Sequence, residues 1–125
     1  MKTINIILKA ILSLIILMPI AGALGIFPPP TPDLYNTPEA FAFIQMIVMG
    51  GYIAYINAIV FAISFVLLWT NRVALAALLI LPITVNVVAF HLFLDGGLFT
   101  AGALLGNIML FINLYFLWQY RAVYL

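Results

Sequence analysis

Four long apolar stretches, separated by isolated charged residues and one short loop, constrain this chain more than any other feature of its sequence. Residues without full charge run over 10–32, 40–71, 73–94 and 96–120, which are 23, 32, 22 and 25 residues long. About 18 consecutive apolar residues are enough to cross the hydrocarbon core of a bilayer as a helix. Each stretch exceeds that length, so the sequence predicts an all-α integral membrane protein that forms one domain over residues 1–125.

The composition excludes a soluble domain and a nucleic-acid-binding protein. Hydrophobic residues make up 68% of the chain and charged residues 6%, whereas soluble domains average about 45–50% and about 25%. The formal net charge is only +1, and the four basic residues are scattered along the chain. Such a chain has no basic patch that could hold a phosphate backbone. The partner that the composition predicts is the lipid bilayer.

The inventory of reactive side chains is equally restrictive. The chain has no cysteine, which excludes disulfides, thiolate nucleophiles, iron–sulfur clusters and cysteine-based zinc sites. It has one histidine, His91, so it cannot build a three-histidine metal site. We therefore predict no metal site, no catalytic set and no cofactor held by the chain alone. Enzyme activity stays open, but the sequence favours a protein without stand-alone catalysis.

Basic and acidic residues alternate between successive boundaries of the apolar stretches. In chain order, the charged residues are Lys2, Lys9, Asp33, Glu39, Arg72, Asp95 and Arg121. Four spans with both termini on the cytoplasmic side place all four basic residues inside, as the positive-inside rule requires. The sequence therefore predicts a multi-pass protein of the plasma (inner) membrane, with cytoplasmic N and C termini.

The predicted architecture is a four-helix bundle with one short additional helix. We expect membrane spans at about 6–27, 52–70, 73–94 and 98–119. A single helix over 38–69 would be about 48 Å long, far more than the hydrocarbon core of about 30 Å. Gly50-Gly51 offers a break in it.

The additional helix is predicted by the sequence that follows the proline-rich loop. Thr37, Pro38 and Glu39 read as an N-cap, a first-turn proline and a first-turn acid. We therefore expect a short helix at about 39–49, lying in or dipping into the outer interface of the membrane.

The first apolar segment has two interpretations. Lys2 and Lys9, an apolar run and Ala21-Gly22-Ala23 are compatible with a signal peptide cleaved after residue 23. The apolar run continues to Phe27, however, which is long enough to span the membrane and favours its retention. Cleavage would leave the orientation of the other three spans unchanged.

Small residues recur at every fourth position in two of the predicted spans. They are Ala54, Ala58 and Ala62 in the second span and Gly102 and Gly106 in the fourth. Such spacing lets helix backbones approach closely in lipid. We expect these faces to pack helices together, either within one bundle or between the two chains of a homodimer.

Four polar residues within or at the end of the predicted spans are the candidate ligand-binding cluster: Asn57, Asn86, His91 and Asp95. Polar groups are costly in lipid unless they are paired. His91 and Asp95 are four residues apart and can pair on one helix face, either as a simple helix-end pair or as a ligand or proton site. Asn86 lies about 140° around the helix from His91, and Asn57 equally fits a plain hydrogen bond between helices.

The third predicted span resembles a known family. Residues 81–86 (LPITVN) and 90–94 (FHLFL) are similar to the DoxX family of small four-span bacterial membrane proteins, whose members show a P-x-x-x-N stretch followed by F-H-x-F-L. The similarity continues in order through Pro38-Glu39-Ala40, Gly51-Tyr52, Thr70-Asn71-Arg72 and the closing Trp118-x-Tyr120-Arg121. It therefore covers nearly the whole chain.

The resemblance implies a role rather than a reaction. The family takes its name from a subunit of an archaeal quinone-reducing complex, so this chain would be a non-catalytic subunit or partner of membrane oxidoreductase subunits. Quinone would then be the ligand, in an apolar pocket around Asn86 and His91. The chain departs from many members, which carry a Lys and a Glu where it has Asn57 and Val60. Two alternatives are a small-solute or lipid-handling membrane protein and a purely structural assembly factor.

Overall fold

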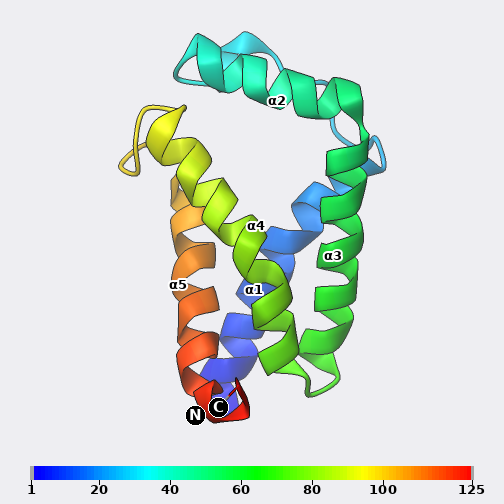
Figure 1. Ribbon diagram of the computed structural model, residues 1–125, viewed down its shortest axis with the longest axis vertical. Helices are drawn as coiled ribbons and strands as arrows, with labels where there is room; N and C mark the ends of the chain where they lie inside the picture. Colours follow the sequence, from blue (N-terminus) through cyan, green and yellow to red (C-terminus); the bar gives the residue numbers. More distant parts are fainter. Residues whose placement is uncertain (1, 125) are drawn as a thin grey trace.

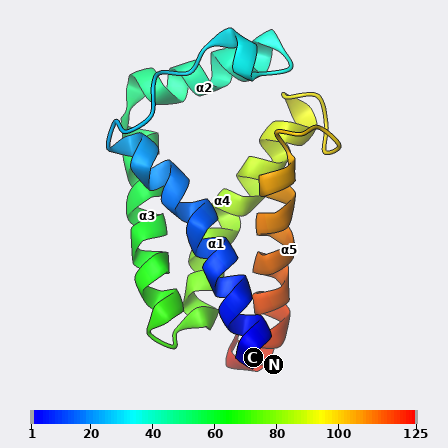
Figure 2. The same cartoon turned by 180° about the vertical axis from the view of Figure 1, so that it is seen from behind.

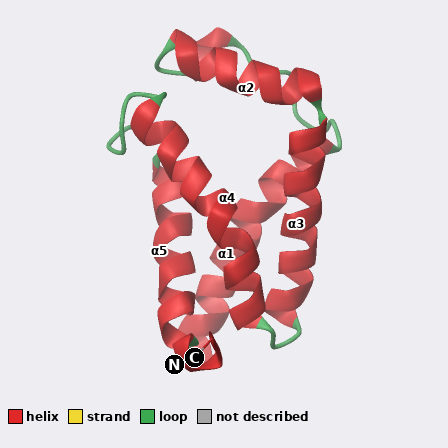
Figure 3. Ribbon diagram, in the orientation of Figure 1, coloured by secondary structure: helices red, strands yellow, loops and turns green. Residues whose placement is uncertain are grey.

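The computed structural model describes residues 2–124, and these residues are 78% helical and contain no strand (Figures 1 and 3). The elements in chain order are α1 (Lys2–Ala23), the 3-10 helix η1 (Pro32–Leu34), α2 (Pro38–Gly50), α3 (Tyr52–Trp69), α4 (Val73–Phe93), α5 (Leu104–Gln119) and α6 (Arg121–Tyr124). The expected all-α class is thus confirmed for the described residues.

Four helices run lengthwise through the molecule, and a fifth lies across one end. Helix α1 packs mainly against α3, whereas α4 packs against both α3 and α5. Helix α2 crosses the end opposite both termini (Figures 1 and 2). The two views agree that α1 and α5 converge near the termini and diverge toward α2.

Helix length and hydropathy fit a membrane protein. Helices α1 and α4, of 22 and 21 residues, are each long and apolar enough to cross a bilayer. Helices α2 and α3 meet the same test only together, and the chain bends by 83° between them. Helix α5 is apolar but has only 16 residues. By length and composition, the described residues thus contain two spanning helices, or three if the bent pair counts as one span.

The bend between α2 and α3 confirms the short helix expected after the proline-rich loop. Thr37 caps α2, because its hydroxyl accepts the backbone N–H of Ala40 at 3.1 Å, and Pro38 occupies the first turn. Gly51 ends the helix with a φ of 77°, a left-handed conformation that glycine adopts without steric cost. Helix α3 then begins at Tyr52 in a new direction.

The helices that correspond to the first and fourth predicted spans differ from the predicted bounds. Helix α1 covers Lys2–Ala23 rather than 6–27, because Gly25 turns the chain with a φ of 80°. Helix α5 begins at Leu104 rather than 98, since residues 98–103 form turns. The end of α1 and the start of α5 differ from the predicted span bounds because apolar turn residues have the hydropathy of a helix, so an apolar span can extend beyond its helix. The bounds of α3 and α4 lie within one residue of those predicted.

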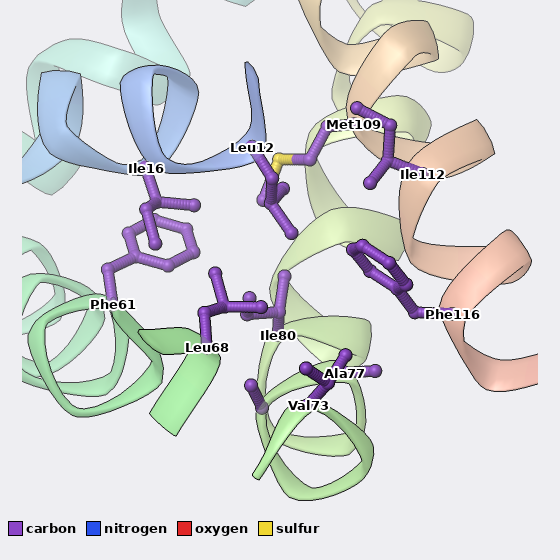
Figure 4. Packing of buried hydrophobic residues seen from close by; sticks show 11 residues of the cluster. Leu12, Ile16, Phe61, Leu68, Val73, Ala77, Ile80, Met109, Ile112 and Phe116 are labelled. Atoms are coloured by element: carbon purple, nitrogen blue, oxygen red, sulfur yellow. The ribbon is translucent and has the colours of Figure 1, made fainter. Parts of the chain in front are cut away.

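The hydrophobic core fills the part of the bundle nearer the termini. Figure 4 shows the core side chains of all four lengthwise helices pointing toward one another: Leu12, Ile16, Phe61, Leu68, Val73, Ala77, Ile80, Met109, Ile112 and Phe116. A buried polar clamp joins α4 to α5 beside them. The Thr84 hydroxyl donates to Asn113 Oδ1 at 2.8 Å, and Asn113 Nδ2 donates to the Ala77 carbonyl at 3.0 Å.

Candidate functional site

A cavity of about 240 Å³ lies between the lengthwise helices, on the α2 side of the core. It is lined by Ile15, Met18, Pro19, Phe61, Val87, His91, Gly102, Leu105, Gly106 and Met109. Among these described residues, His91 carries the only polar side chain. An apolar cavity with one hydrogen-bonding group is typical of sites for small lipophilic molecules. Its volume suits a single substituted ring, since a cavity of about 150 Å³ already holds benzene.

His91 and Asp95 form the pair that their spacing predicts. His91 lies in the last turn of α4, and its Nδ1 is 3.4 Å from Asp95 Oδ2, with both side chains largely buried. Nδ1 itself is buried and makes no hydrogen bond that meets geometric criteria. The Asp95 carboxylate thus faces Nδ1 of the imidazole. Nε2 is then the atom of His91 that can bond to a molecule in the cavity.

Asp95 also ties the loop before α2 to the end of α4. Its Oδ1 accepts the backbone N–H of Asn36 at 2.8 Å, and Asn36 Nδ2 donates to the Asp95 carbonyl at 3.1 Å. The Thr37 hydroxyl donates to the Leu94 carbonyl. We call these contacts between Asn36, Thr37, Leu94 and Asp95 the loop latch. One carboxylate therefore serves both the latch and the histidine of the cavity.

Aromatic side chains pack beside the loop latch. The Tyr35 ring stands edge-on to Phe90 with centroids 6.4 Å apart, and Phe43 of α2 lies 5.7 Å from the same ring. Phe90 in turn stands edge-on to His91 at 5.1 Å. Burial, together with the nearby Asp95 carboxylate, raises the pKa of the Tyr35 hydroxyl above its ordinary value of 10.0. Tyr35 therefore stays neutral beside Asp95.

Sequence reasoning missed the two loop residues of the latch, Asn36, which bonds to Asp95, and Thr37, which bonds to Leu94. Asn36 and Thr37 precede Asp95 by about 60 positions, and no periodicity connects an irregular loop to a helix end. The available signal was weak: a short polar run immediately before a proline-started helix. Thr37 was assigned to capping, and it both caps α2 and joins the latch.

The structure does not bring the other two polar candidates into the cavity. Asn86 is exposed on α4, and its Nδ2 donates to the Pro82 carbonyl of the same helix at 3.0 Å. Of the two residues expected around the pocket, Asn86 and His91, only His91 lines the cavity. Asn57 of α3 is partly buried but does not line the cavity.

The glycines of the fourth predicted span form one wall of the cavity. A Cβ atom on Gly106 would lie 3.0 Å from Val87 Cγ1, so α5 approaches α4 as closely as glycine allows. A Cβ on Gly102 would lie 3.6 Å from His91 Cε1, in ordinary contact. The alanines of α3 form a less continuous face, because Ala54 and Ala58 are partly buried whereas Ala62 is exposed.

Comparisons with known proteins leave the site to be interpreted from its own geometry. No family model, no curated protein and no solved structure matches the chain. Within residues 2–124, no group of three or more His, Asp or Glu side chains could hold a metal ion. What the site offers is therefore an apolar ring-sized space and one imidazole oriented by a carboxylate.

Proposed function

We propose that the chain is a four-span, DoxX-like protein of the inner membrane with both termini in the cytoplasm. The distribution of charge supports this orientation. The start of α1, the α3–α4 turn with Arg72, and α6 with Arg121 lie at one end of the molecule, whereas η1, α2 and Asp95 lie at the other (Figure 1). Basic residues mark the cytoplasmic face. Helix α5, of 16 residues, is then a short fourth span extended by the apolar turns before it.

Within that topology, we propose that the protein binds a quinone-class molecule as a small, non-catalytic partner of a membrane redox assembly. The observation that carries this proposal is the apolar cavity with His91 as its single hydrogen-bonding side chain, oriented by Asp95. A quinone ring has the size and apolar faces that the cavity accepts, and its oxygens need a polar contact of this kind. The family resemblance points to the same ligand.

The test is purification in mild detergent from the native membrane, with mass spectrometry of extracted small molecules and co-purifying proteins. The native chain should retain a quinone in near-stoichiometric amount and bring down an oxidoreductase subunit. His91→Ala should weaken quinone binding about five- to tenfold at equal protein yield, because one buried hydrogen bond is worth about 1–1.5 kcal/mol.

Asn86→Ala is the matched control, because Asn86 is a polar residue of the same helix that lies outside the cavity. It should retain quinone as the native chain does. A native preparation without quinone, or equal retention in all three proteins, would contradict the proposal. A partner protein recovered without any small molecule would indicate a structural assembly factor instead.

A further inference from the structure

We propose that the cavity opens sideways, between α1 and α5, into the lipid of the outer half of the bilayer, and that it admits amphiphiles with an uncharged polar head. This inference rests on the proposed function, to which it adds a direction of access and a head-group charge. The direction of access distinguishes a ligand dissolved in the membrane from a solute that arrives through water.

The exposure of the lining residues locates the opening. Met18 and Pro19 of α1 are exposed, as are Leu105 of α5 and Gly102 in the turn before it. The lining residues contributed by α3 and α4 are buried or only partly exposed. The exposed rim therefore belongs to α1 and α5, the two helices that diverge toward α2 (Figure 2), whereas all four helices contribute to the buried or partly buried lining.

The loop latch closes the end of the bundle that faces water. Asp95 is buried and accepts the backbone N–H of Asn36. The Thr37 hydroxyl donates to the carbonyl of Leu94, the residue that follows α4. Helix α2 continues from this attachment across the end of the molecule to Gly51 (Figure 1). A solute coming from the outer aqueous side would have to displace the loop latch and α2 to reach His91. A molecule in the lipid beside α1 and α5 would not.

Helix lengths place the opening at the depth of lipid. At 1.5 Å per residue, α3 and α5 are about 27 Å and 24 Å long, less than the hydrocarbon core of about 30 Å. The apolar region therefore reaches α2, whose outward side chains Met46 and Met49 are strongly exposed. The rim formed by Met18 and Leu105 lies below α2 and hence faces acyl chains.

The placement of charge selects the head group. An anionic head such as a phosphate would meet the buried carboxylate of Asp95 near His91. The basic side chains of residues 2–124 lie toward the opposite end of the bundle: Lys9, for example, sits 5.9 Å from the Trp69 ring at the end of α3. A neutral head that hydrogen-bonds to His91 meets no such repulsion.

The first test measures which solvent the opening faces. Because the chain has no cysteine, Leu105→Cys gives a single labelling site in the full-length protein, and bimane attached there reports its surroundings in lipid vesicles. Nitroxides on lipid acyl chains should quench the label strongly and aqueous iodide weakly. Leu34→Cys, in the exposed 3-10 helix η1, should show the reverse. Iodide quenching at position 105 as strong as at position 34 would overturn the lateral opening.

The second test narrows the opening. In nanodiscs, Leu105→Trp should weaken binding of a decyl-substituted benzoquinone about tenfold or more, because the larger ring overpacks the rim. Leu114→Trp is the matched control, since Leu114 is on the same helix and is 48% exposed against 45% for Leu105, but it does not line the cavity. It should bind as the native chain does.

The outcomes separate this inference from the proposed function. If the native chain binds the decyl quinone and both tryptophan variants bind equally, the lateral opening is wrong and the ligand site stands. If decyl phosphate binds as tightly as the decyl quinone, selection for a neutral head is wrong. If the native chain binds no decyl quinone, the proposed function fails, and the quenching experiment alone decides where the cavity opens.

Discussion

The two halves of the bundle use the same four helices in different ways. Near the termini, α1, α3, α4 and α5 enclose the core, with Phe116 fully buried at its centre and the Thr84–Asn113 clamp beside it. Near α2, the helices separate around a cavity, and the chain holds them with a loop, a carboxylate and aromatic rings. The packed core and the cavity therefore occupy different parts of one bundle, and apart from Phe61 and Met109, which belong to both, their residues can be altered separately.

The largest expected effect is in the packed half. Phe116→Ala should lower the free energy of unfolding by about 3–5 kcal/mol, because it removes a fully buried ring and leaves a void that neighbouring helices fill only in part. Phe99→Ala, at a fully exposed position in the α4–α5 turn, should change it by less than about 0.5 kcal/mol. Reversible unfolding in mixed micelles measures both. Equal losses would show that the two halves do not differ in packing.

An intermediate effect is expected at the loop latch. Asp95→Ala should cost about 1–3 kcal/mol, since it leaves the Asn36 N–H without its acceptor. The loss should appear as faster hydrogen exchange in residues 31–37 and at the end of α4, while the core amides near Ile80 stay protected. Asp33→Asn, at an exposed position of the same loop, is the control. Uniformly faster exchange through α4 and α5 would mean that the two halves are one cooperative unit.

A smaller effect is expected at two glycines, where the same substitution by alanine should change the stability in opposite directions. Gly106→Ala should destabilise by about 1–2 kcal/mol, because its Cβ would lie 3.0 Å from Val87 Cγ1 across the tight α4–α5 contact. Gly50→Ala, where a Cβ meets nothing within 4 Å and the residue ends a helix, should be neutral or stabilise by up to about 0.5–1 kcal/mol. Thermal unfolding in detergent compares the two. If Gly50→Ala lowered the stability instead, α2 would have to pack against the rest of the protein along its length and not only at its ends.

The features that the sequence predicted well depend on local chemistry. Thr37-Pro38-Glu39 starts α2, Gly51 breaks it from α3, and the spacing of His91 and Asp95 pairs them. Hydropathy alone does not mark where the helices of the first and fourth predicted spans end or begin, because Leu24 and Leu98 are as apolar in a turn as in a helix.

The features that the sequence left hidden depend on which distant segments meet. Nothing local shows that Asn36 meets Asp95. Nor does the sequence show that the cavity takes walls from α1 and α3 as well as from α4 and α5. The helical angle between Asn86 and His91 did indicate that the two side chains point apart, and the structure places Asn86 outside the cavity. Periodicity therefore predicts the direction in which a side chain leaves its own helix. The residue that it meets on another segment depends on how the bundle assembles.

The bend at Gly51, between α2 and α3, has a consequence for biosynthesis. Residues 40–71 leave the ribosome as one uninterrupted apolar stretch of 32 residues, with no charge to tell the insertion machinery where the span begins. The positive φ of Gly51 lets the chain bend by 83° between α2 and α3, so that this stretch folds as two helices and not as one. A residue with a side chain at this position would pay about 1–2 kcal/mol to adopt that backbone. The point at which this long uncharged stretch divides into two helices is thus set by a single hydrogen atom in place of a side chain.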